Sequence, residues 1–383
     1  MNRPVFSERI ARLRPSVVRE ILAVAQAPGV ISFAGGLPAP EWLPALSGLA
    51  VPTSLGQYGP TPGEPDLRRA LSAYLAQLGL ECPSERILIL SGSQQGIDLV
   101  AKLFVDLGSR VVSESPTYLA ALQVFDLFGA SVRGVPFDGD GPSLASFERE
   151  ISAPDTRLCY LNPTFQNPTG RLYDSAQRAR VASILDRAKV PLFEDDPYRE
   201  LAFDAPAPAP IVSGLRSAPW VYQSSFSKMF MPGMRLGFLA CSADLWEPLE
   251  RLKQAADLHA NRVSQWLALS LLEAPDARAR LNALRASYRQ KRDVFASALE
   301  RELSDLAEWQ LPSGGLFFWL RLKEPRSLLP LLPRAIERGV AFVPGEAFFP
   351  GVPVPGYLRL NFSNASSSEV TLGLARLSAL LRE

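Results

Sequence analysis

Lys228 stands in a stretch whose residue types suit covalent chemistry. The segment "SFSKMFMPGMRLG", residues 225–237, places it between the hydroxyls of Ser225 and Ser227 and an apolar run, with Arg235 seven residues further on. The chain has six lysines and 34 arginines, so arginine is its usual cation. A lysine amine close to other cations in partly apolar surroundings has a lowered pKa and attacks carbonyls, whereas a guanidinium stays protonated. The stretch therefore predicts a reactive amine.

A second polar cluster follows the apolar run "ILIL" at 87–90. The following "SGSQQG" places Ser93 and Gln94 at the start of a helix. The free backbone amides and the positive end of the helix dipole bind phosphate at such a point. Ser93 acting only as a helix cap is the structural alternative.

Two more clusters end the apolar runs at 157–162 and 190–196. The loop "YLNPTFQNPTG" can direct the Asn167 side chain at a ligand, or it is simply a turn. "FEDDPYREL" places Asp195 and Tyr198 just beyond a strand, where they fit a ring nitrogen and a phenolic oxygen. Adjacent carboxylates also suit a solvated strand end or a metal site.

The elements that must position these residues alternate along the chain. Short apolar runs are separated by helix-length segments, which predicts an α/β fold with a mainly parallel sheet and helices on its faces. Ligands bind at the strand ends of such sheets. From about residue 245 to 305 the pattern is helical, and "GGLFFWLRL" and "YLRLNFS" then predict antiparallel strands of a smaller α+β unit.

Composition excludes several classes of function. A formal charge of +1 argues against a protein that mainly binds nucleic acid or anionic lipid, so small molecules are the expected ligands. The single histidine, His259, rules out a multi-histidine zinc site, and we expect no metal. Three widely spaced cysteines form no disulfide framework. The start of the chain has no uninterrupted apolar signal segment, so a cytoplasmic location is expected.

The ordered set of motifs resembles the fold type I pyridoxal 5′-phosphate (PLP) aminotransferases of class I/II, in particular the 2-aminoadipate and kynurenine aminotransferase group. It runs from "PSVVREILAVAQAPGVISFAGGLP" through "QYGPTPGEPDLR", "SGSQQGID", "NPTFQNPTG", "EDDPY", "SFSKMFMPGMRLG" and "GVAFVPGEAF" to "YLRLNFS". The resemblance implies a large PLP-binding domain at 46–285 with a mainly parallel seven-stranded sheet. It also implies an N-terminal arm at 1–45 that joins a small domain at 286–383.

The resemblance assigns roles at the cofactor. Lys228 resembles the lysine that holds PLP as a Schiff base and shuttles a proton at the substrate α-carbon. Asp195 resembles the carboxylate that keeps the pyridine nitrogen protonated, so that the ring accepts electrons. Asn167 and Tyr198 resemble the partners of the cofactor 3′-oxygen, and Tyr118 resembles the ring that stacks on PLP. The phosphate ligands would be Ser93, Gln94, Ser225, Ser227 and Arg235.

Three further roles concern the substrate and a second subunit. Arg359 resembles the fork that binds the substrate α-carboxylate in a bidentate manner. Gly36 of "FAGGLP" lies where the family closes backbone over the substrate, and Asn167 is expected to contact it too. Tyr58 resembles a residue that reaches the phosphate of the neighbouring subunit, which implies a homodimer.

Substrate choice stays open at this point. The expected reaction moves an amino group between an L-amino acid of the 2-aminoadipate, glutamate, leucine or aromatic type and a 2-oxo acid such as 2-oxoglutarate, by ping-pong kinetics. Arg19 or Arg262 could meet a distal carboxylate, and either could equally be a surface arginine. Alternatives are a C–S lyase or decarboxylase of the same fold, or a noncatalytic PLP-sensing regulator domain; the roughly 30 residues before "ISFAGGLP" leave no room for the DNA-binding module of such a regulator.

Overall fold

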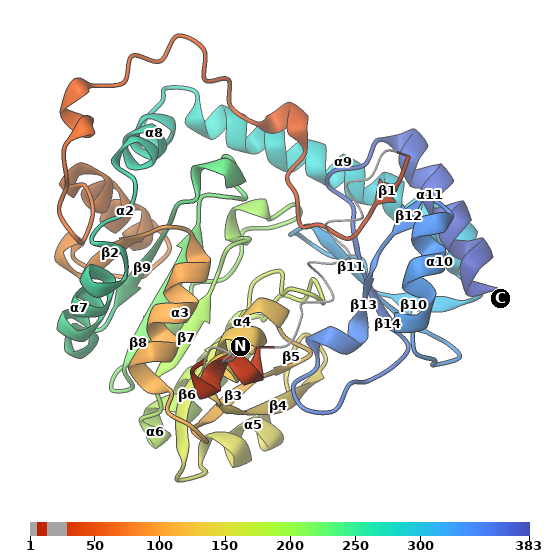
Figure 1. Cartoon of the computed structure of the whole chain (residues 1–383), viewed down its shortest axis with the longest axis horizontal. Helices are drawn as coiled ribbons and strands as arrows, with labels where there is room; N and C mark the ends of the chain where they lie inside the picture. The colour runs from red at the N-terminus through yellow and green to blue at the C-terminus, as the bar shows by residue number, and fades with distance from the viewer. Residues whose placement is uncertain (1–5, 14–28) are drawn as a thin grey trace, which may run out of the picture.

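A mixed sheet of eight strands forms the centre of the larger part of the molecule (Figure 1). The structure, a computed structural model, describes residues 6–13 and 29–383. The strand order is β2 (Ile87–Leu90), β9 (Gly237–Cys241), β8 (Trp220–Ser225), β7 (Leu192–Asp195), β6 (Thr156–Leu161), β3 (Arg110–Ser115), β4 (Ser131–Asp138) and β5 (Gly141–Pro142). The five strands from β8 to β4 are parallel, whereas β9 is antiparallel to both neighbours and β5 is antiparallel to β4.

The strands read as continuous apolar runs because both faces of the sheet are covered. In β2, Leu88 and Leu90 face one core, and Ile87 and Ile89 face the other. On the first face lie α3 (Ser93–Phe104), α4 (Leu119–Phe128) and α7 (Trp246–Asp257). On the second face lie α2 (Pro65–Gln77), α5 (Leu144–Ile151), α6 (Ser175–Ala188) and α8 (Arg262–Leu272).

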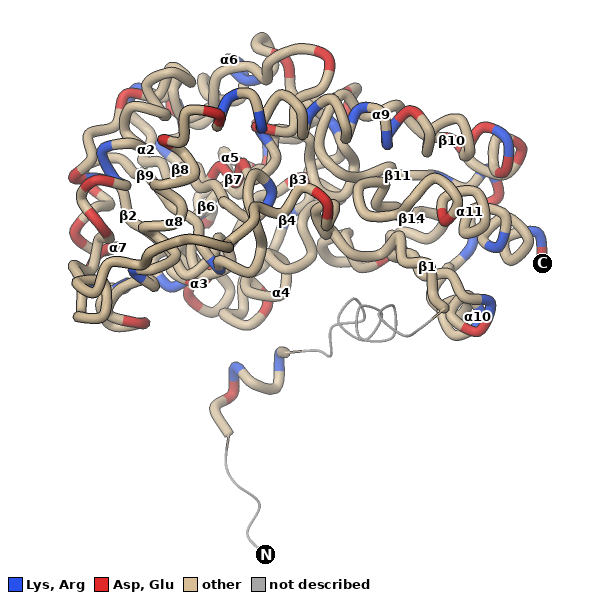
Figure 2. Tube along the Cα trace, turned by 90° about the horizontal axis from the view of Figure 1, so that it is seen from above, with Lys and Arg blue, Asp and Glu red and all other residues tan. Residues whose placement is uncertain are grey.

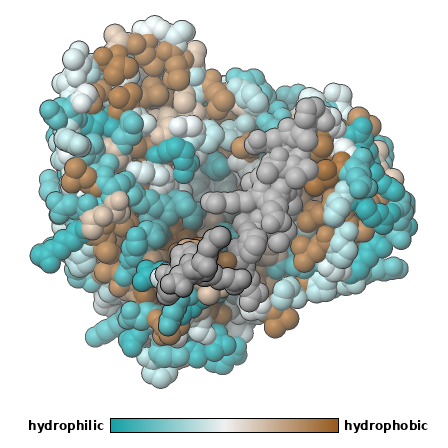
Figure 3. Space-filling view, viewed as in Figure 1, coloured by the Kyte–Doolittle hydropathy of each residue, from teal (hydrophilic) through white to brown (hydrophobic). Residues whose placement is uncertain are grey.

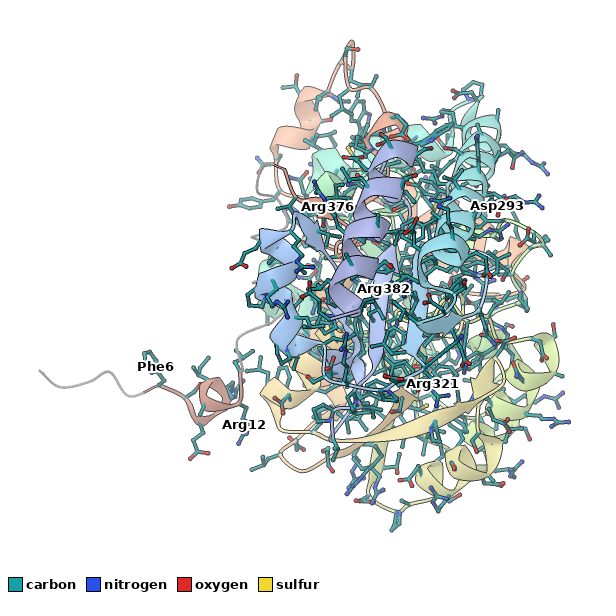
Figure 4. The ribbon with its side chains drawn as sticks, turned by 90° about the vertical axis from the view of Figure 1, so that its right-hand side faces the viewer. Phe6, Arg12, Asp293, Arg321, Arg376 and Arg382 are labelled. Carbon is teal, nitrogen blue, oxygen red and sulfur yellow. The ribbon has the colours of Figure 1, made fainter. Side chains whose placement is uncertain are left out.

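A smaller α+β unit contains the antiparallel sheet β10 (Ala307–Trp309), β11 (Phe317–Leu322), β14 (Tyr357–Asn361) and β13 (Val343–Pro344), in that order. The helices α9 (Ala277–Leu303), α10 (Leu332–Glu337) and α11 (Ser367–Leu381) accompany it. The N-terminal strand β1 (Ile31–Ser32) pairs in parallel with β12 (Val340–Ala341). Arg376 on α11 donates to the Gly339 carbonyl, and Arg382, directly after the end of α11, binds Asp305 (Figure 4).

The helix α9 connects the two parts of the molecule, and residues 33–57 run along the same side (Figure 1). Short 3₁₀ helices complete the chain: η1 (Glu8–Arg12), η2 (Pro40–Trp42), η3 (Thr53–Gly56), η4 (Ser84–Arg86), η5 (Arg199–Leu201), η6 (Ile211–Gly214), η7 (Pro232–Met234), η8 (Ala243–Leu245), η9 (Leu329–Leu331) and η10 (Gly345–Phe348). Acidic and basic residues are interspersed along the chain (Figure 2). Within residues 6–13 and 29–383, no helix has both the length and the apolar character needed to cross a membrane.

The expected α/β fold with a mainly parallel sheet and a smaller α+β unit is confirmed. The sheet has one strand more than the seven expected, because the two-residue β5 adds a short antiparallel edge to β4. The helical stretch expected from 245 to 305 is three separate helices, α7, α8 and α9. The division of the chain at residues 45 and 285 stays a prediction, and α9 runs across the second of these points.

Candidate active site

A cavity of about 390 Å³ lies at the carboxyl ends of the parallel strands. Its volume is within the range of small-molecule sites. Twelve of the fourteen residues predicted to form the site line it: Gly36, Ser93, Gln94, Tyr118, Asn167, Asp195, Tyr198, Ser225, Ser227, Lys228, Arg235 and Arg359. The fold thus brings together residues that lie up to 323 positions apart in the sequence because parallel strands end at the same edge of the sheet.

One end of the cavity is built for an anion. The helix α3 starts at Ser93, and its N-cap is Gly92, at a φ of +85°. No side chain caps this helix, so the alternative of Ser93 as a simple cap is wrong. A Cβ atom on Gly92 would lie 2.6 Å from Nη2 of Arg235, which shows that the guanidinium lies directly over this turn. Free amides and the guanidinium suit a phosphate group.

Elsewhere in the cavity wall, Asp195 is held by two neutral donors from the strands on either side of β7. The Tyr160 hydroxyl donates to Oδ2 over 2.8 Å, and the Gln223 amide donates to Oδ1 over 3.0 Å. Burial raises the pKa of Asp195 to about 6, and the bonds from Gln223 and Tyr160 act in the opposite direction. The carboxylate is therefore mostly ionised at neutral pH, and it is ready to pair with a protonated ring nitrogen.

Asn167 and Tyr198 form a polar pair in the same cavity. The Asn167 amide nitrogen lies 3.5 Å from the Tyr198 hydroxyl, and its backbone N–H donates to Oδ1 of Asn162 over 2.7 Å. Burial is the largest cause of the raised pKa of Tyr198, so its hydroxyl keeps its proton at neutral pH. Both side chains can donate to an oxygen atom of a ligand ring.

Arg359 is a buried cation without an acidic partner among the described residues. Its Nη1 donates to Oδ1 of Asn167 over 2.8 Å and its Nη2 to the Ala34 carbonyl over 2.6 Å, while Nε has no hydrogen-bond partner in the part of the chain that the structure describes. The guanidinium carbon lies 4.2 Å from the centre of the Phe317 ring. Burial lowers its pKa to about 10, so it stays charged at neutral pH. A buried guanidinium of this kind calls for an anionic ligand.

Lys228 follows β8 and projects into the cavity between these groups. Its Nζ donates to the Gly36 carbonyl over 2.7 Å. Burial, and after it the positive charges of Arg359 and Arg235, lower the pKa of the amine to about 8. The reactive amine expected from the sequence is therefore supported by its surroundings, because a sizeable fraction is unprotonated near neutral pH.

Two predicted site residues do not line the cavity. Tyr58 is 76% exposed, and its ring meets the edge of the His259 ring. Arg19 lies outside the described residues. Arg262, the other candidate for a distal carboxylate, binds Glu64 and the Ser54 carbonyl instead, so its role within this chain is structural.

The sequence analysis missed four residues that support the site: Tyr160, Gln223, Glu114 and Phe317. The first three lie inside runs predicted to be strands, and the sequence pattern alone assigns them no role at the site. The adjacent acids Glu194 and Asp196 are buried in ion pairs with Arg178 and Arg199. No cluster of three or more histidine, cysteine or acidic residues able to hold a metal occurs in the described ranges.

The donor set fits PLP. A phosphate group matches the start of α3 with Arg235, a pyridine nitrogen matches Asp195, a phenolic oxygen matches Asn167 and Tyr198, and an aldehyde matches the amine of Lys228. Arg359 remains for a substrate carboxylate. Three cations face a single carboxylate in this cavity, which suits a ligand set rich in negative charge.

Comparisons with known proteins agree with this geometry. The sequence model of the family "Aminotransferase class I and II" matches residues 27–377. A 2-aminoadipate transaminase of Thermus thermophilus is 36% identical over 98% of this chain and 96% of its own. The structure of an alpha-aminoadipate aminotransferase of that species, complexed with N-(5'-phosphopyridoxyl)-L-leucine, has a TM-score of 0.90 at 35% identity over 98% of this chain and 97% of its own. A kynurenine aminotransferase of Pyrococcus horikoshii, in complex with PMP, has a TM-score of 0.91 at 31% identity over 98% and 96% of the two chains.

The fold and the cavity define a PLP enzyme of fold type I. The chain belongs to the aminotransferase class I and II family, and the protein is an aminotransferase with PLP as its cofactor.

Proposed function

We propose that the protein transfers the amino group of an L-amino acid to 2-oxoglutarate by ping-pong kinetics, with Lys228 as the catalytic amine. The observation that carries this proposal is the position of Lys228, an amine whose pKa is lowered to about 8, in the same cavity as Arg359, whose Nε has no hydrogen-bond partner among the described residues. A reaction on an amino acid needs two groups in one site: an amine that reacts with carbonyls and a guanidinium that binds the α-carboxylate in a bidentate manner.

When bound, PLP supplies a carbonyl that accepts the amino group and a ring that withdraws electrons. In the proposed mechanism, Asp195 stays ionised and would hold the proton on the ring nitrogen of the bound cofactor. Arg359 binds the substrate α-carboxylate and thereby orients the α-carbon toward Lys228. The free Lys228 amine then takes the α-proton as a general base. Asn167 and Tyr198 would donate hydrogen bonds to the phenolic oxygen of the bound cofactor.

The phosphate end has an anchoring role in this proposal. Ser93, Gln94, Ser225, Ser227 and Arg235 surround the start of α3 and bind the phosphate. The Gly36 backbone is close to the Lys228 amine and closes over the substrate. Since these contacts do not involve the reacting atoms, they keep the cofactor in place in both half-reactions.

The proposed amino donors are 2-aminoadipate, glutamate, leucine and aromatic amino acids. Support comes from the names of the similar proteins, a 2-aminoadipate transaminase and a kynurenine aminotransferase, and from the leucine adduct in one similar structure. Arg19, which lies outside the described residues, is the proposed partner of a distal carboxylate.

We also propose that the protein acts as a homodimer in which Tyr58 reaches the phosphate of the partner's site. Apolar side chains gather on the surface over residues 43–51 (Figure 3), where Leu43, Leu46, Leu49 and Val51 are exposed. A groove of about 1640 Å³ continues from this patch along α9. A contiguous apolar patch of this kind favours association with a second copy. The cytoplasm is the proposed location, because the three cysteines are buried free thiols.

A screen of amino donors against the loaded enzyme tests the function. Each donor should bleach the visible absorbance of the lysine-bound cofactor, and added 2-oxoglutarate should restore it, because the two half-reactions are separable. We expect glutamate, 2-aminoadipate, leucine and phenylalanine to act, whereas an amine without a carboxylate should not. A spectrum that no amino acid changes would contradict the proposal.

A further inference from the structure

Glu114 is a fully buried acid next to the active site, and the proposed chemistry leaves it without a role. It lies near the end of β3, and Oε1 accepts hydrogen bonds from the Asn162 backbone N–H over 2.8 Å and from the Tyr173 hydroxyl over 3.2 Å. The Thr117 hydroxyl donates to Oε2 over 3.2 Å. No lysine or arginine of the described ranges forms an ion pair with it. Three neutral donors therefore replace a counter-ion.

Two of the three donors, Asn162 and Thr117, lead to walls of the cavity. The Asn162 side chain accepts from the Asn167 backbone N–H over 2.7 Å and donates to the Asp195 carbonyl. Thr117 directly precedes Tyr118, whose ring lines the cavity. Glu114 thus connects the ends of β3, β6 and β7, which carry the proposed stacking ring, the partner of the phenolic oxygen and the partner of the ring nitrogen.

We propose that ionised Glu114 is a positioning residue that fixes these three walls relative to one another around the cofactor. It acts through Asn162 and Thr117 and touches neither substrate nor PLP. The inference rests on the proposed roles of Tyr118, Asn167 and Asp195. A carboxylate suits the task because it accepts several bonds at once, and bonds to a charged acceptor are the strong ones.

Protonation would weaken this arrangement in the neutral pH range. Burial raises the pKa of Glu114 to about 7, against the lowering effect of its hydrogen bonds. A protonated carboxyl must donate its proton to the Thr117 or Tyr173 hydroxyl, since the Asn162 N–H cannot accept. The bond to Asn162 then loses its charge assistance.

The other titratable groups facing Glu114 keep one charge state over this range. They are Tyr173 on the loop before α6, and Cys159 and Tyr160 on β6. Burial raises the pKa values of all three, so each stays neutral at pH 7. Arg178 reaches the Tyr173 carbonyl rather than Glu114, and Asp195 lies beyond Asn162 with a pKa of about 6.

The test measures the binding of PLP to the apo-protein of the wild type and of Glu114→Gln. Quenching of protein fluorescence reports the binding, from pH 6 to pH 8.5. Glutamine resembles the protonated acid. We expect the ratio of the variant's Kd to that of the wild type to be about tenfold at pH 8 and near one at pH 6, since a hydrogen bond to a charged group is lost only where Glu114 is ionised. Using a ratio cancels the titration of Lys228 and of PLP itself. In Glu114→Gln, the visible circular dichroism of bound PLP should also be weaker than in the wild type above pH 7.

Glu346→Gln is the matched control. Glu346 is also buried and accepts from the Leu328 backbone N–H over 2.8 Å and the Ser327 hydroxyl over 3.0 Å, but it lies in the smaller unit and does not line the cavity. Its Kd should equal that of the wild type at every pH. A pH-independent ratio for Glu114→Gln, or the same loss in Glu346→Gln, would overturn the inference.

Tyr173→Phe keeps the test valid if Glu114→Gln does not fold. Removing this donor raises the pKa of Glu114, so the ratio of the variant's Kd to that of the wild type should peak between about pH 7 and pH 8 and decline at higher pH. A ratio without such a maximum would refute the role of ionised Glu114. Failure of the proposed function is distinguishable, because it would appear as wild-type protein that binds PLP but does not react with amino donors.

Discussion

At the scale of single residues, the ligand-binding atoms are identified by buried positive charges that have no acidic partner among the described residues. Arg359 is the clearest case, because its Nε has no partner among the described residues and its side chain is only 4% exposed. Lys228 likewise contacts a carbonyl rather than an acid. Such desolvated cations are costly in isolation, so their presence indicates an anionic ligand in the working enzyme.

Arg359→Lys should lower kcat/KM for glutamate by about a hundredfold, near 3 kcal/mol, because an ammonium replaces the bidentate fork with a single point charge. Steady-state kinetics with glutamate and 2-oxoglutarate measure this. The affinity for PLP should change little. Arg376→Lys, on α11 and bound to the Gly339 carbonyl, is the control that should behave as the wild type. An unchanged kcat/KM in Arg359→Lys would remove Arg359 from the substrate site.

The lowered pKa of Lys228 predicts how fast apo-protein captures PLP covalently. The reactive form is the neutral amine, so the rate should rise with pH, with a midpoint of about 8 set first by burial and then by Arg359 and Arg235. Stopped-flow absorbance at a series of pH values gives this midpoint. Arg359→Gln should move it upward, since a nearby positive charge disfavours the protonated amine. A midpoint near 10 in the wild type would contradict the assigned surroundings.

At the scale of elements, the start of α3 and the turn after η7 together form the end of the cavity that we propose binds the phosphate. Both depend on unusual backbone: Gly92 at a φ of +85° and Arg235 at +48°. The absence of a Cβ atom at Gly92 is what lets the guanidinium lie over the helix start.

Gly92→Ala should weaken PLP binding about tenfold, because backbone strain of roughly 1–3 kcal/mol adds to the displacement of Arg235. Gly233→Ala is a control in the neighbouring η7, since its Cβ atom would have no neighbour within 4 Å. Equilibrium titration of the apo-proteins with PLP compares the two. Equal affinities of both variants would show that the start of α3 does not bind the phosphate.

The elements explain which residues were predictable from the sequence. Asp195 and Lys228 each directly end or follow an apolar run, so the rule that parallel strands end at one edge of the sheet was enough to bring them together. Tyr160 and Gln223 were not predictable, because they lie within strands and only the pairing of strands across the sheet shows their role. Gln223 pairs with Asp195 in register, and Tyr160 pairs with Phe193, which lies two residues before Asp195.

Arg262 is a residue that the sequence suggested as a site residue but that the structure places elsewhere. Its charge and its place in the chain suited a substrate carboxylate, but the fold brings Glu64 from a distant segment to its side. β4 was also unrecognised, since Arg133, Gly134 and Pro136 interrupt its apolar pattern.

At the scale of the whole molecule, the proposed dimer makes each site depend on two chains. Tyr58 is exposed; its ring meets the edge of the His259 ring, and its carbonyl accepts a hydrogen bond from Arg262. Nothing within its own chain's cavity requires it, because it does not line that cavity.

Mixing Tyr58→Ala and Lys228→Ala subunits tests this arrangement. If Tyr58 serves the partner's site, a mixed dimer has one site with both defects and one intact site, and random pairing should restore about a quarter of the wild-type activity. Each variant alone should be strongly impaired. Activity of the re-annealed mixture equal to the average of the two separate variants would show that Tyr58 acts on its own chain.

The central claim is that Lys228, alone among the six lysines, carries the cofactor. Borohydride reduction of the loaded enzyme, followed by peptide mapping with mass spectrometry, measures this directly. We expect the phosphopyridoxyl group on the peptide that contains Lys228, and we expect Lys228→Arg to yield no labelled peptide, because a guanidinium does not condense with the aldehyde. A label on another lysine, such as the buried Lys253, or no label in the wild type would contradict the account.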